Sequence, residues 1–217
     1  MAPRARPLRI LLTGFGPFPG APENPTGPLV KALARKFRKS PQPVSTHIFK
    51  TTYDAVDRDL PRLLKKYKPD ALLMFGLATK SRGLRIETKA RNRIARFPDA
   101  SFVIPKSHVI EAGGPASLPI HAPKTALLRA AKSRGVSARL SVNAGDYLCN
   151  YLYWHALKAA QHSGRPRLAA FIHVPALSGS VTAEQLAEAG EAIMQAALVS
   201  LRRRARAKKS RVNRLTL

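Results

Sequence analysis

The hydrophobic pattern alternates between short apolar runs and longer amphipathic segments. Five short runs are bounded by Gly, Pro or polar residues, as is typical of strands: residues 8–13, 44–52, 70–77, 136–142 and 168–174. Apolar residues at helical spacing predict five helices: from 24–26 to about 39, 53–67, 123–133, 147–161 and 182–205. Strand and helix therefore alternate along most of the chain.

This alternation predicts an α/β fold, a three-layer α/β/α sandwich with a mostly parallel, mixed central sheet. Residues 70–77 are almost continuously apolar, which is typical of a central strand covered on both faces. Residues 80–106 are polar and carry few helix signals, so an antiparallel excursion or a long loop is expected around residues 84–87. We expect a single domain over residues 1–201 and a basic tail over residues 202–217.

The charge balance is unusual, with 38 basic against 12 acidic side chains and a net charge of +26. Residues 202–217 hold eight of these cations and no acidic residue, and removing them from the total still leaves +18. Such a field favours anionic partners, and a nucleic-acid-associated protein that uses its tail is one alternative. The basic runs lack interleaved aromatic residues and any nucleic-acid-binding motif, so specific recognition is weakly supported.

The single cysteine excludes an internal disulfide and a cysteine-rich metal site, which suits a reducing cytoplasm. The apolar run at residues 10–12 is too short for a signal peptide, and no segment approaches a membrane span. The chain also lacks a dinucleotide fingerprint and metal-ligand spacing. We therefore expect a cytoplasmic protein without metal or cofactor, in which five histidines are ordinary surface or core residues: His47, His108, His121, His155 and His162.

That cysteine, Cys149, is the first candidate for chemistry. Residues 143–146 form the predicted turn between a strand and a helix, and Asp146 is placed to cap the helix. Cys149 then lies in the first helical turn, where unpaired N–H groups and the helix dipole favour a nucleophilic thiolate. Taken alone, however, a lone helical cysteine is more often a small buried apolar residue.

His173 closes the apolar run 168–174, and ligands gather at the carboxyl ends of parallel strands. The helix carrying Cys149 begins at the same edge, and a Cys–His pair suits acyl transfer. Glu87 is a candidate to orient the histidine. From the residues alone, the favoured alternative is a surface carboxylate that balances neighbouring cations, Arg85, Lys89 and Arg91.

Four motifs, in matching order, resemble the pyroglutamyl peptidase I family, also called pyrrolidone-carboxylate peptidase, of the cysteine peptidase family C15. They are Thr13-Gly14-Phe15-Gly16-Pro17-Phe18 with Asn24-Pro25-Thr26, Gly76-Leu77-Ala78 followed by Glu87, Asn143-Ala144-Gly145 through Cys149-Asn150-Tyr151, and Phe171-Ile172-His173-Val174-Pro175. The similarity spans about residues 8 to 176. It implies a phosphorylase/hydrolase-like fold and hydrolysis of an N-terminal pyroglutamyl residue through a thioester.

The resemblance also implies residue roles. Cys149, His173 and Glu87 would be catalytic, and the substrate would lie against Phe15, Phe18, Gly76, Leu77, Tyr147 and Leu148. Family members are commonly homo-oligomers. Aromatic residues of the cysteine helix, Tyr151, Tyr153 and Trp154, are candidates for a subunit contact, although core packing explains them equally well.

Departures from the family pattern cluster in residues 79–118. Lys80-Ser81 replaces a usual Gly-Arg, Thr88 replaces the arginine after the glutamate, and Arg91 replaces an aliphatic residue. The motif at residues 95–99 lacks its leading aspartate and trailing asparagine, the segment before Leu118 is shortened, and residues 176–179 also differ. A relative that has lost peptidase activity and binds a lactam-like ligand or a partner is therefore a second alternative.

Overall fold

A computed structural model describes residues 6–18 and 20–215, with side chains placed through residue 207. The main sheet has six strands in the order β2-β1-β3-β8-β4-β7, and β5 pairs with β6 beside it. The strands are β1 (Ile10–Phe15), β2 (Val44–Phe49), β3 (Ala71–Leu77), β4 (Leu84–Glu87), β5 (Lys89–Arg91), β6 (Ser117–Pro119), β7 (Ala138–Ser141) and β8 (Leu168–Val174). The helices are α1 (Thr26–Lys36), α2 (Tyr53–Tyr67), α3 (Lys124–Lys132), α4 (Leu148–Ser163) and α5 (Ala183–Leu215).

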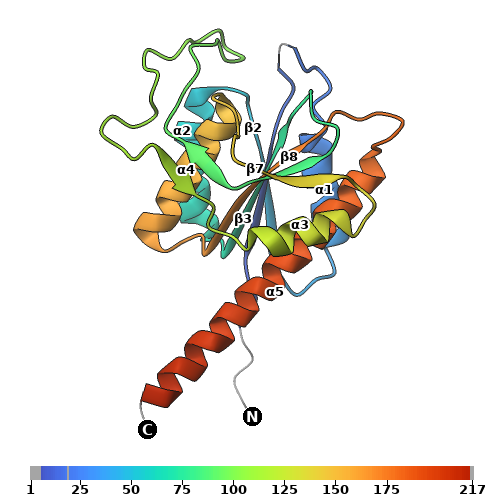
Figure 1. The fold of residues 1–217 in the computed structure, drawn as a ribbon, viewed down its shortest axis with the longest axis vertical. Helices are drawn as coiled ribbons and strands as arrows, with labels where there is room; N and C mark the ends of the chain where they lie inside the picture. Colours follow the sequence, from blue (N-terminus) through green and yellow to red (C-terminus); the bar gives the residue numbers. More distant parts are fainter. Residues whose placement is uncertain (1–5, 19, 216–217) are drawn as a thin grey trace.

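Helices cover both faces of the main sheet, which confirms the predicted α/β sandwich (Figure 1). Helices α1, α3 and α5 pack on one face, and α2 and α4 pack on the other. Strands β2, β1, β3 and β8 run parallel, whereas β4 is antiparallel to β8 and parallel to β7. The antiparallel segment expected around residues 84–87 is therefore β4, and it lies inside the main sheet.

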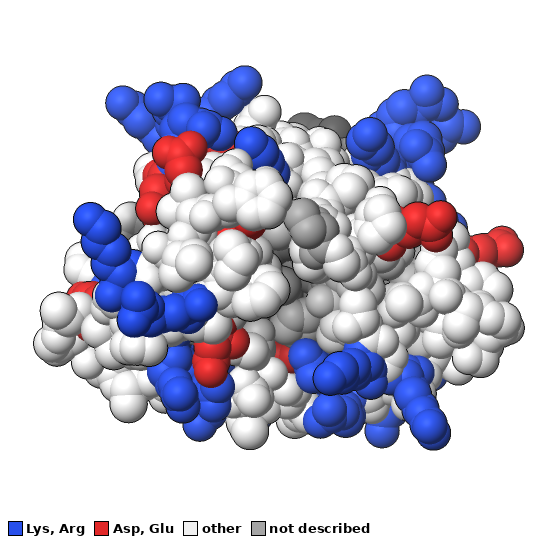
Figure 2. All heavy atoms as spheres, turned by 90° about the horizontal axis from the view of Figure 1, so that it is seen from above, with Lys and Arg blue, Asp and Glu red and all other residues white. Residues whose placement is uncertain are grey.

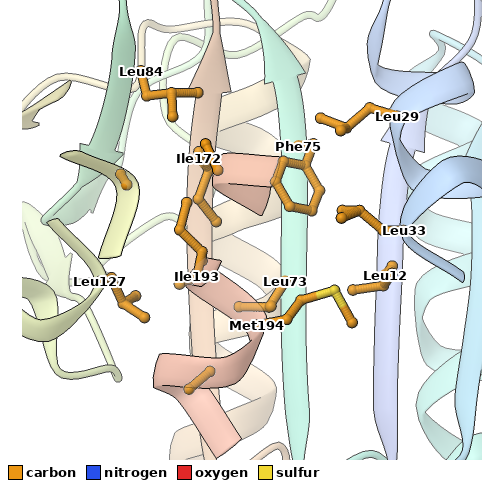
Figure 3. Close-up of a cluster of buried hydrophobic side chains, with 14 of the residues drawn as sticks. Leu12, Leu29, Leu33, Leu73, Phe75, Leu84, Leu127, Ile172, Ile193 and Met194 are labelled. Carbon is orange, nitrogen blue, oxygen red and sulfur yellow. The ribbon is translucent and has the colours of Figure 1, made fainter. Parts of the chain in front are cut away.

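Alternate residues of the central strands fill the two halves of the core. On β8, Ile172 packs with the α1, α3 and α5 side, and Phe171 packs with the α2 and α4 side. Figure 3 shows the first half, where side chains of α1 and α5 meet the sheet: Leu29, Leu33, Ile193 and Met194 against Leu12, Leu73, Phe75 and Ile172. Each such buried side chain stabilises the fold by roughly 1.5–3 kcal/mol relative to an exposed one.

The predicted boundaries of α2 are confirmed, because local sequence sets both ends. The hydroxyl of Thr52 accepts a hydrogen bond from the backbone N–H of Ala55 at 3.2 Å, which caps the N-terminus. Lys68 has a left-handed backbone conformation with φ of 44°, and Pro69 follows it. The resulting helix is amphipathic and buries Val56, Leu60 and Leu63.

Helix α5 runs about ten residues beyond its predicted end at residue 205. Residues 191–215 contain no Gly or Pro and are rich in Ala, Leu, Arg and Lys, which all favour the helix. Among the described side chains of α5, Leu201 is the last in the core, and beyond it the helix projects from the body (Figure 1). The segment expected as a basic tail is thus a helical extension through Leu215.

Within residues 6–18 and 20–215, no helix combines the length and the apolar character that a membrane span requires.

Candidate active site

The carboxyl ends of β1, β3 and β8 meet at one edge of the sheet, at the top of Figure 1. Helix α4 begins near this edge and places Cys149 in its first turn. Figure 2 looks onto this edge and shows Lys and Arg side chains around the rim of a hollowed, largely uncharged centre. The edge therefore offers a largely uncharged hollow near the N-terminus of α4.

His173 and Glu87 form a buried pair on neighbouring strands of this edge. Their Nδ1 and Oε1 atoms lie 2.8 Å apart, and the Glu87 side chain has no exposed surface. The guanidinium Nε of Arg85 lies 3.3 Å from the same carboxylate oxygen. Glu87 is therefore not the surface carboxylate favoured from the residues alone, because it is buried, hydrogen-bonded to the His173 imidazole and charge-paired with the Arg85 guanidinium.

Cys149 lies against the same part of the sheet, over Gly76. A Cβ atom added to Gly76 would lie only 2.7 Å from the Cys149 Sγ. Gly76 on β3 is the register partner of His173 on β8. Since paired strands are only about 4.8 Å apart, the sulfur lies over the strand position next to the one that carries the imidazole. The structure thus places Cys149, His173 and Glu87 at the same edge of the sheet, and their catalytic roles stay a prediction.

The protonation states differ from the expected thiolate. Burial raises the pKa of Cys149 to about 12, the negative charge of Glu87 adds to this rise, and Arg85 opposes it. Although Cys149 is partly exposed, its dense surroundings outweigh the helix dipole and favour the neutral thiol. Burial also lowers the pKa of His173 despite its hydrogen bond to Glu87, which favours a neutral imidazole.

Asp146 does not cap α4, contrary to the sequence prediction. The N-cap position is Tyr147, and it supplies no side-chain cap. The carboxylate of Asp146 instead forms a hydrogen-bonded ion pair with Arg91 and lies 3.8 Å from the Nε of Arg93. Two guanidinium groups compete with the helix for this side chain. The N–H groups in the first turn of α4 therefore have no hydrogen bond to the side chain of the cap residue, and they can donate to a ligand oxygen.

The expected substrate contacts are only partly brought together. Phe15 and Leu77 line a cavity of about 740 Å³, along with Ile48, Ala176 and Leu177. Phe18 forms an isolated antiparallel bridge with Ala21 in the loop between β1 and α1, and it does not line this cavity. Neither do Cys149, His173 and Gly76, so the cavity adjoins the strand ends without enclosing the Cys–His pair.

The two expected contacts at the start of α4 have other surroundings. The Leu148 side chain is 1% exposed in the core, so only its backbone can face a ligand. The Tyr147 hydroxyl donates to the Pro98 carbonyl oxygen at 3.0 Å, and its ring makes edge contacts with the Tyr53 and Phe97 rings. Tyr147 therefore fastens the loop around residue 98 to α4.

The sequence did not predict that three further residues support the site. Arg85 lies two positions before Glu87 on the same face of β4, a period-2 spacing that was visible in the sequence. The Tyr153 hydroxyl donates to the Glu87 carbonyl oxygen at 3.0 Å. The buried Asn150 amide joins α4 to β5, accepting from the Arg91 N–H and donating to the Arg91 and Arg93 carbonyl oxygens. No sequence signal identified these two tertiary contacts.

The aromatic residues of α4 belong mainly to the core. Tyr153 and Trp154 are at most 1% exposed, which is incompatible with a subunit contact in this structure. Tyr151 is half-buried, and its hydroxyl donates to the Asp57 carboxylate at 2.9 Å. Over the described part of the chain, no three His, Cys, Asp or Glu side chains are grouped so that they could hold a metal ion.

Comparison with known proteins gives one consistent result. The family model for pyroglutamyl peptidase matches residues 8–207. A pyrrolidone-carboxylate peptidase from Thermococcus litoralis is 33% identical over 168 residues, which cover 77% of this chain and 76% of that protein. Pyrrolidone-carboxylate peptidase 1 from Ralstonia nicotianae is 32% identical over 169 residues, covering 77% and 78%.

Solved structures agree with these sequence matches. A mutant pyrrolidone carboxyl peptidase from Pyrococcus furiosus superimposes with a TM-score of 0.83 at 28% identity, covering 89% of this chain and 100% of that chain. The Thermococcus litoralis pyrrolidone carboxyl peptidase gives a TM-score of 0.79 at 29% identity, covering 90% and 96%. Sequence and fold lead to the same assignment, and the chain belongs to the pyroglutamyl peptidase family.

Proposed function

We propose that this chain is a thiol-dependent exopeptidase that removes an N-terminal pyroglutamyl residue from peptides. Cys149 is the nucleophile, His173 the general acid and base, and Glu87 the carboxylate that orients the histidine. The observation that carries the proposal is the buried His173–Glu87 pair, with 2.8 Å between Nδ1 and Oε1, beside a cysteine in the first turn of α4. Family membership supports the same assignment.

In the first step, neutral His173 accepts the thiol proton as the sulfur of Cys149 attacks the carbonyl carbon of the pyroglutamyl residue. The lowered pKa of His173 keeps the imidazole free to act as a base, and the raised pKa of Cys149 makes the thiol the resting form. The carbonyl electrons move to oxygen, where the N–H groups at the start of α4 stabilise the negative charge.

In the second step, the imidazolium of His173 gives its proton to the leaving amine as the C–N bond breaks, which leaves a thioester on Cys149. Water then attacks the thioester carbonyl, with His173 accepting one of its protons. Collapse of that intermediate releases pyroglutamate and restores the thiol. Throughout, the Glu87 carboxylate accepts a hydrogen bond from the Nδ1–H of His173 and balances the transient positive charge.

Selectivity follows from the apolar surroundings of the strand ends. A lactam ring carries no charge, whereas a free α-amino group would bring an ammonium ion against the surfaces of Phe15 and Leu77. Burying an ammonium ion against these apolar side chains is costly, so the site favours the cyclised residue. We assign the apolar contacts with the lactam ring to Phe15 and Leu77. The Leu148 side chain is buried in the core and is not assigned to the substrate.

A relative without activity is the less favoured alternative. The departures in residues 79–118 alter the support of the site, yet Cys149, His173 and Glu87 are all present. The family match extends across both the altered segment and these residues.

Two further features of the proposal concern assembly and environment. We expect a homo-oligomer, and size-exclusion chromatography with light scattering measures it directly. A nucleophilic free thiol suits a reducing compartment such as the cytoplasm, where it is not oxidised.

The decisive experiment is release of a chromophore from a pyroglutamyl anilide under reducing conditions. We expect turnover by the native chain and none above background by Cys149→Ser. A prolyl anilide, which has the five-membered ring but carries a charged amine, is the matched substrate control and should be cleaved far more slowly. Absence of pyroglutamyl cleavage above the Cys149→Ser level contradicts the proposal.

A further inference from the structure

A second cavity lies at the opposite edge of the sheet, between the start of β1 and the outer part of α5. Its volume is about 1000 Å³, and it is lined by Arg6, Pro7, Leu8, Pro41, Gln42, Arg167, Leu201, Arg202, Ala205 and Arg206. Residues 6–8 and the start of the projecting part of α5 lie beside each other at this end, at the bottom of the body in Figure 1. The cavity is thus remote from the Cys–His pair.

Three segments distant in sequence each contribute cations to this cavity. Arg6 precedes β1, Arg167 immediately precedes β8, and Arg202 and Arg206 lie one helical turn apart on α5. Residues at i and i+4 share one face of a helix, so these last two guanidinium groups lie on the same side of α5. Four arginines therefore line one concave surface.

One buried carboxylate holds part of this cluster in place. Asp70 lies directly before β3 with no exposed side-chain surface, and its Oδ1 lies 2.7 Å from Arg6, 3.3 Å from Arg165 and 3.7 Å from Arg167. Three positive charges meet one negative charge, so two of them remain uncompensated. Asp70 also accepts from the backbone N–H of Arg9 at 3.0 Å, which fixes its orientation.

The α5 side of the cavity has no negative partner. All 12 carboxylate side chains belong to described residues, and none forms an ion pair with Arg202 or Arg206. Both arginines are exposed at the cavity mouth. The four lining arginines and Asp70 therefore leave three excess positive charges here, which is an environment that stabilises a ligand with several negative charges.

We propose that this cavity binds the phosphodiester backbone of a single-stranded nucleic acid. Guanidinium groups match phosphate oxygens in a bidentate geometry, and several phosphates at regular spacing can meet arginines from both walls. A strand can enter a concave site between two walls, whereas a duplex or a flat anionic membrane reaches only its rim. The lining contains no aromatic residue for base stacking, so binding is independent of base sequence.

The test is fluorescence anisotropy of labelled oligo-U and oligo-dT, roughly 12 nucleotides long to exceed one small binding site. The full chain is compared with Arg202→Gln/Arg206→Gln. The matched control is Arg35→Gln/Arg38→Gln, which removes the same charge from exposed positions on and just after α1. At about 50 mM salt we expect a loss of affinity of at least about tenfold for the cavity variant and less than about twofold for the control.

The salt dependence gives a second measurement. Each lost phosphate contact should reduce the slope of log K against log salt by about 0.7 for a single strand, so the cavity variant should lose about 1.4. If the protein binds oligo-U more tightly than oligo-dT, the ligand is RNA, and the opposite preference identifies DNA. Equal losses for both variants, no measurable binding, or tighter binding to a duplex or to phosphatidylserine vesicles would overturn the proposal. Cys149→Ser should bind normally, which separates this result from that of the peptidase assay.

Discussion

Nδ1 of His173 lies 2.8 Å from Oε1 of Glu87, although the two residues are 86 positions apart in sequence. The pair exists because β8 and β4 are antiparallel neighbours and both residues point to the α4 side of the sheet. Both side chains are almost completely buried, so water does not compete for the hydrogen bond. The imidazole is thereby held in one orientation, with Nε2 left as the nitrogen that exchanges protons.

Replacing Glu87 with Gln tests this orientation. The shape is retained, but the negative charge that balances the imidazolium is lost, and the amide can favour the wrong tautomer. We expect kcat/KM for a pyroglutamyl anilide to fall on the order of 10²- to 10⁴-fold. Glu111→Gln is the control, because Glu111 pairs with Lys158 away from the site and its loss should leave activity within about twofold. Equal activity of the two variants would contradict the role of Glu87.

The pH dependence tests the resting protonation states. Because burial lowers the pKa of His173, kcat/KM should rise as pH increases through a value below 6.5. Because burial raises the pKa of Cys149 to about 12, the rate of alkylation by iodoacetamide should continue to increase above pH 8. Alkylation that is already independent of pH near neutrality would instead indicate a resting thiolate paired with an imidazolium.

Arg85 is expected to tune the same groups without touching the substrate. Its Nε lies 3.3 Å from the Glu87 carboxylate. Although burial dominates both shifts, the Arg85 charge lowers the pKa of Cys149 and of His173. Arg85→Gln should therefore move the acidic limb of kcat/KM to higher pH. Arg82→Gln removes the same charge from an exposed position and should leave the limb in place. A uniform loss of activity without a pH shift would indicate a purely structural role.

Gly76 is expected to tolerate no side chain. A Cβ at this position would lie 2.7 Å from the sulfur of Cys149 and 2.7 Å from the nearest ring atom of Phe171. Gly76→Ala should lower kcat at least about tenfold and destabilise the fold by roughly 1–3 kcal/mol through overpacking. In Gly179→Ala, the added Cβ would have no heavy atom within 4 Å, so we expect normal activity and stability. Full activity of Gly76→Ala would mean that the sulfur is not confined over β3.

The apolar pattern was sufficient to predict most of the fold. The continuous runs at residues 70–77 and 168–174 became β3 and β8 at the centre of the sheet, because only strands covered on both faces need such uniform apolarity. Residues 84–87 were harder to place. A four-residue strand with polar neighbours carries too little periodicity to indicate that it pairs with β8 on one side and β7 on the other.

The positions of Cys149 and His173 at one edge of the sheet could be predicted, but their electrostatics could not. Cys149 and His173 stand at element ends that the pattern locates well. Desolvation depends on how densely other segments pack around a group, so the raised pKa of Cys149 was invisible in the sequence. The partner of Asp146 was missed for the same reason, since Arg91 lies 55 positions away and reaches it only in the folded chain.

Asn150 is expected to hold the altered segment onto the site, because its buried amide makes three hydrogen bonds with β5 and the residues after it. The Oδ1 atom accepts from the Arg91 N–H at 2.8 Å, and the Nδ2 atom donates to the Arg91 and Arg93 carbonyl oxygens at 2.8 and 3.0 Å. Asn150→Ala leaves these backbone groups unpaired, at a cost of roughly 2–4 kcal/mol in the free energy of unfolding, measured by urea titration.

The control is Asn143→Ala, since the exposed Asn143 makes one local hydrogen bond to the Gly145 N–H and its loss should cost less than about 1 kcal/mol. Asn143 lies in the turn before α4 and Asn150 lies in the first turn of the helix. The comparison therefore separates the effect of burying the amide from the effect of its place in the chain. If residues 89–93 are positioned by this amide, Asn150→Ala should also raise KM, because strand β5 carries Arg91 and its ion pair with Asp146 beside the start of α4. Unchanged stability together with unchanged KM would show that the segment is held by other contacts.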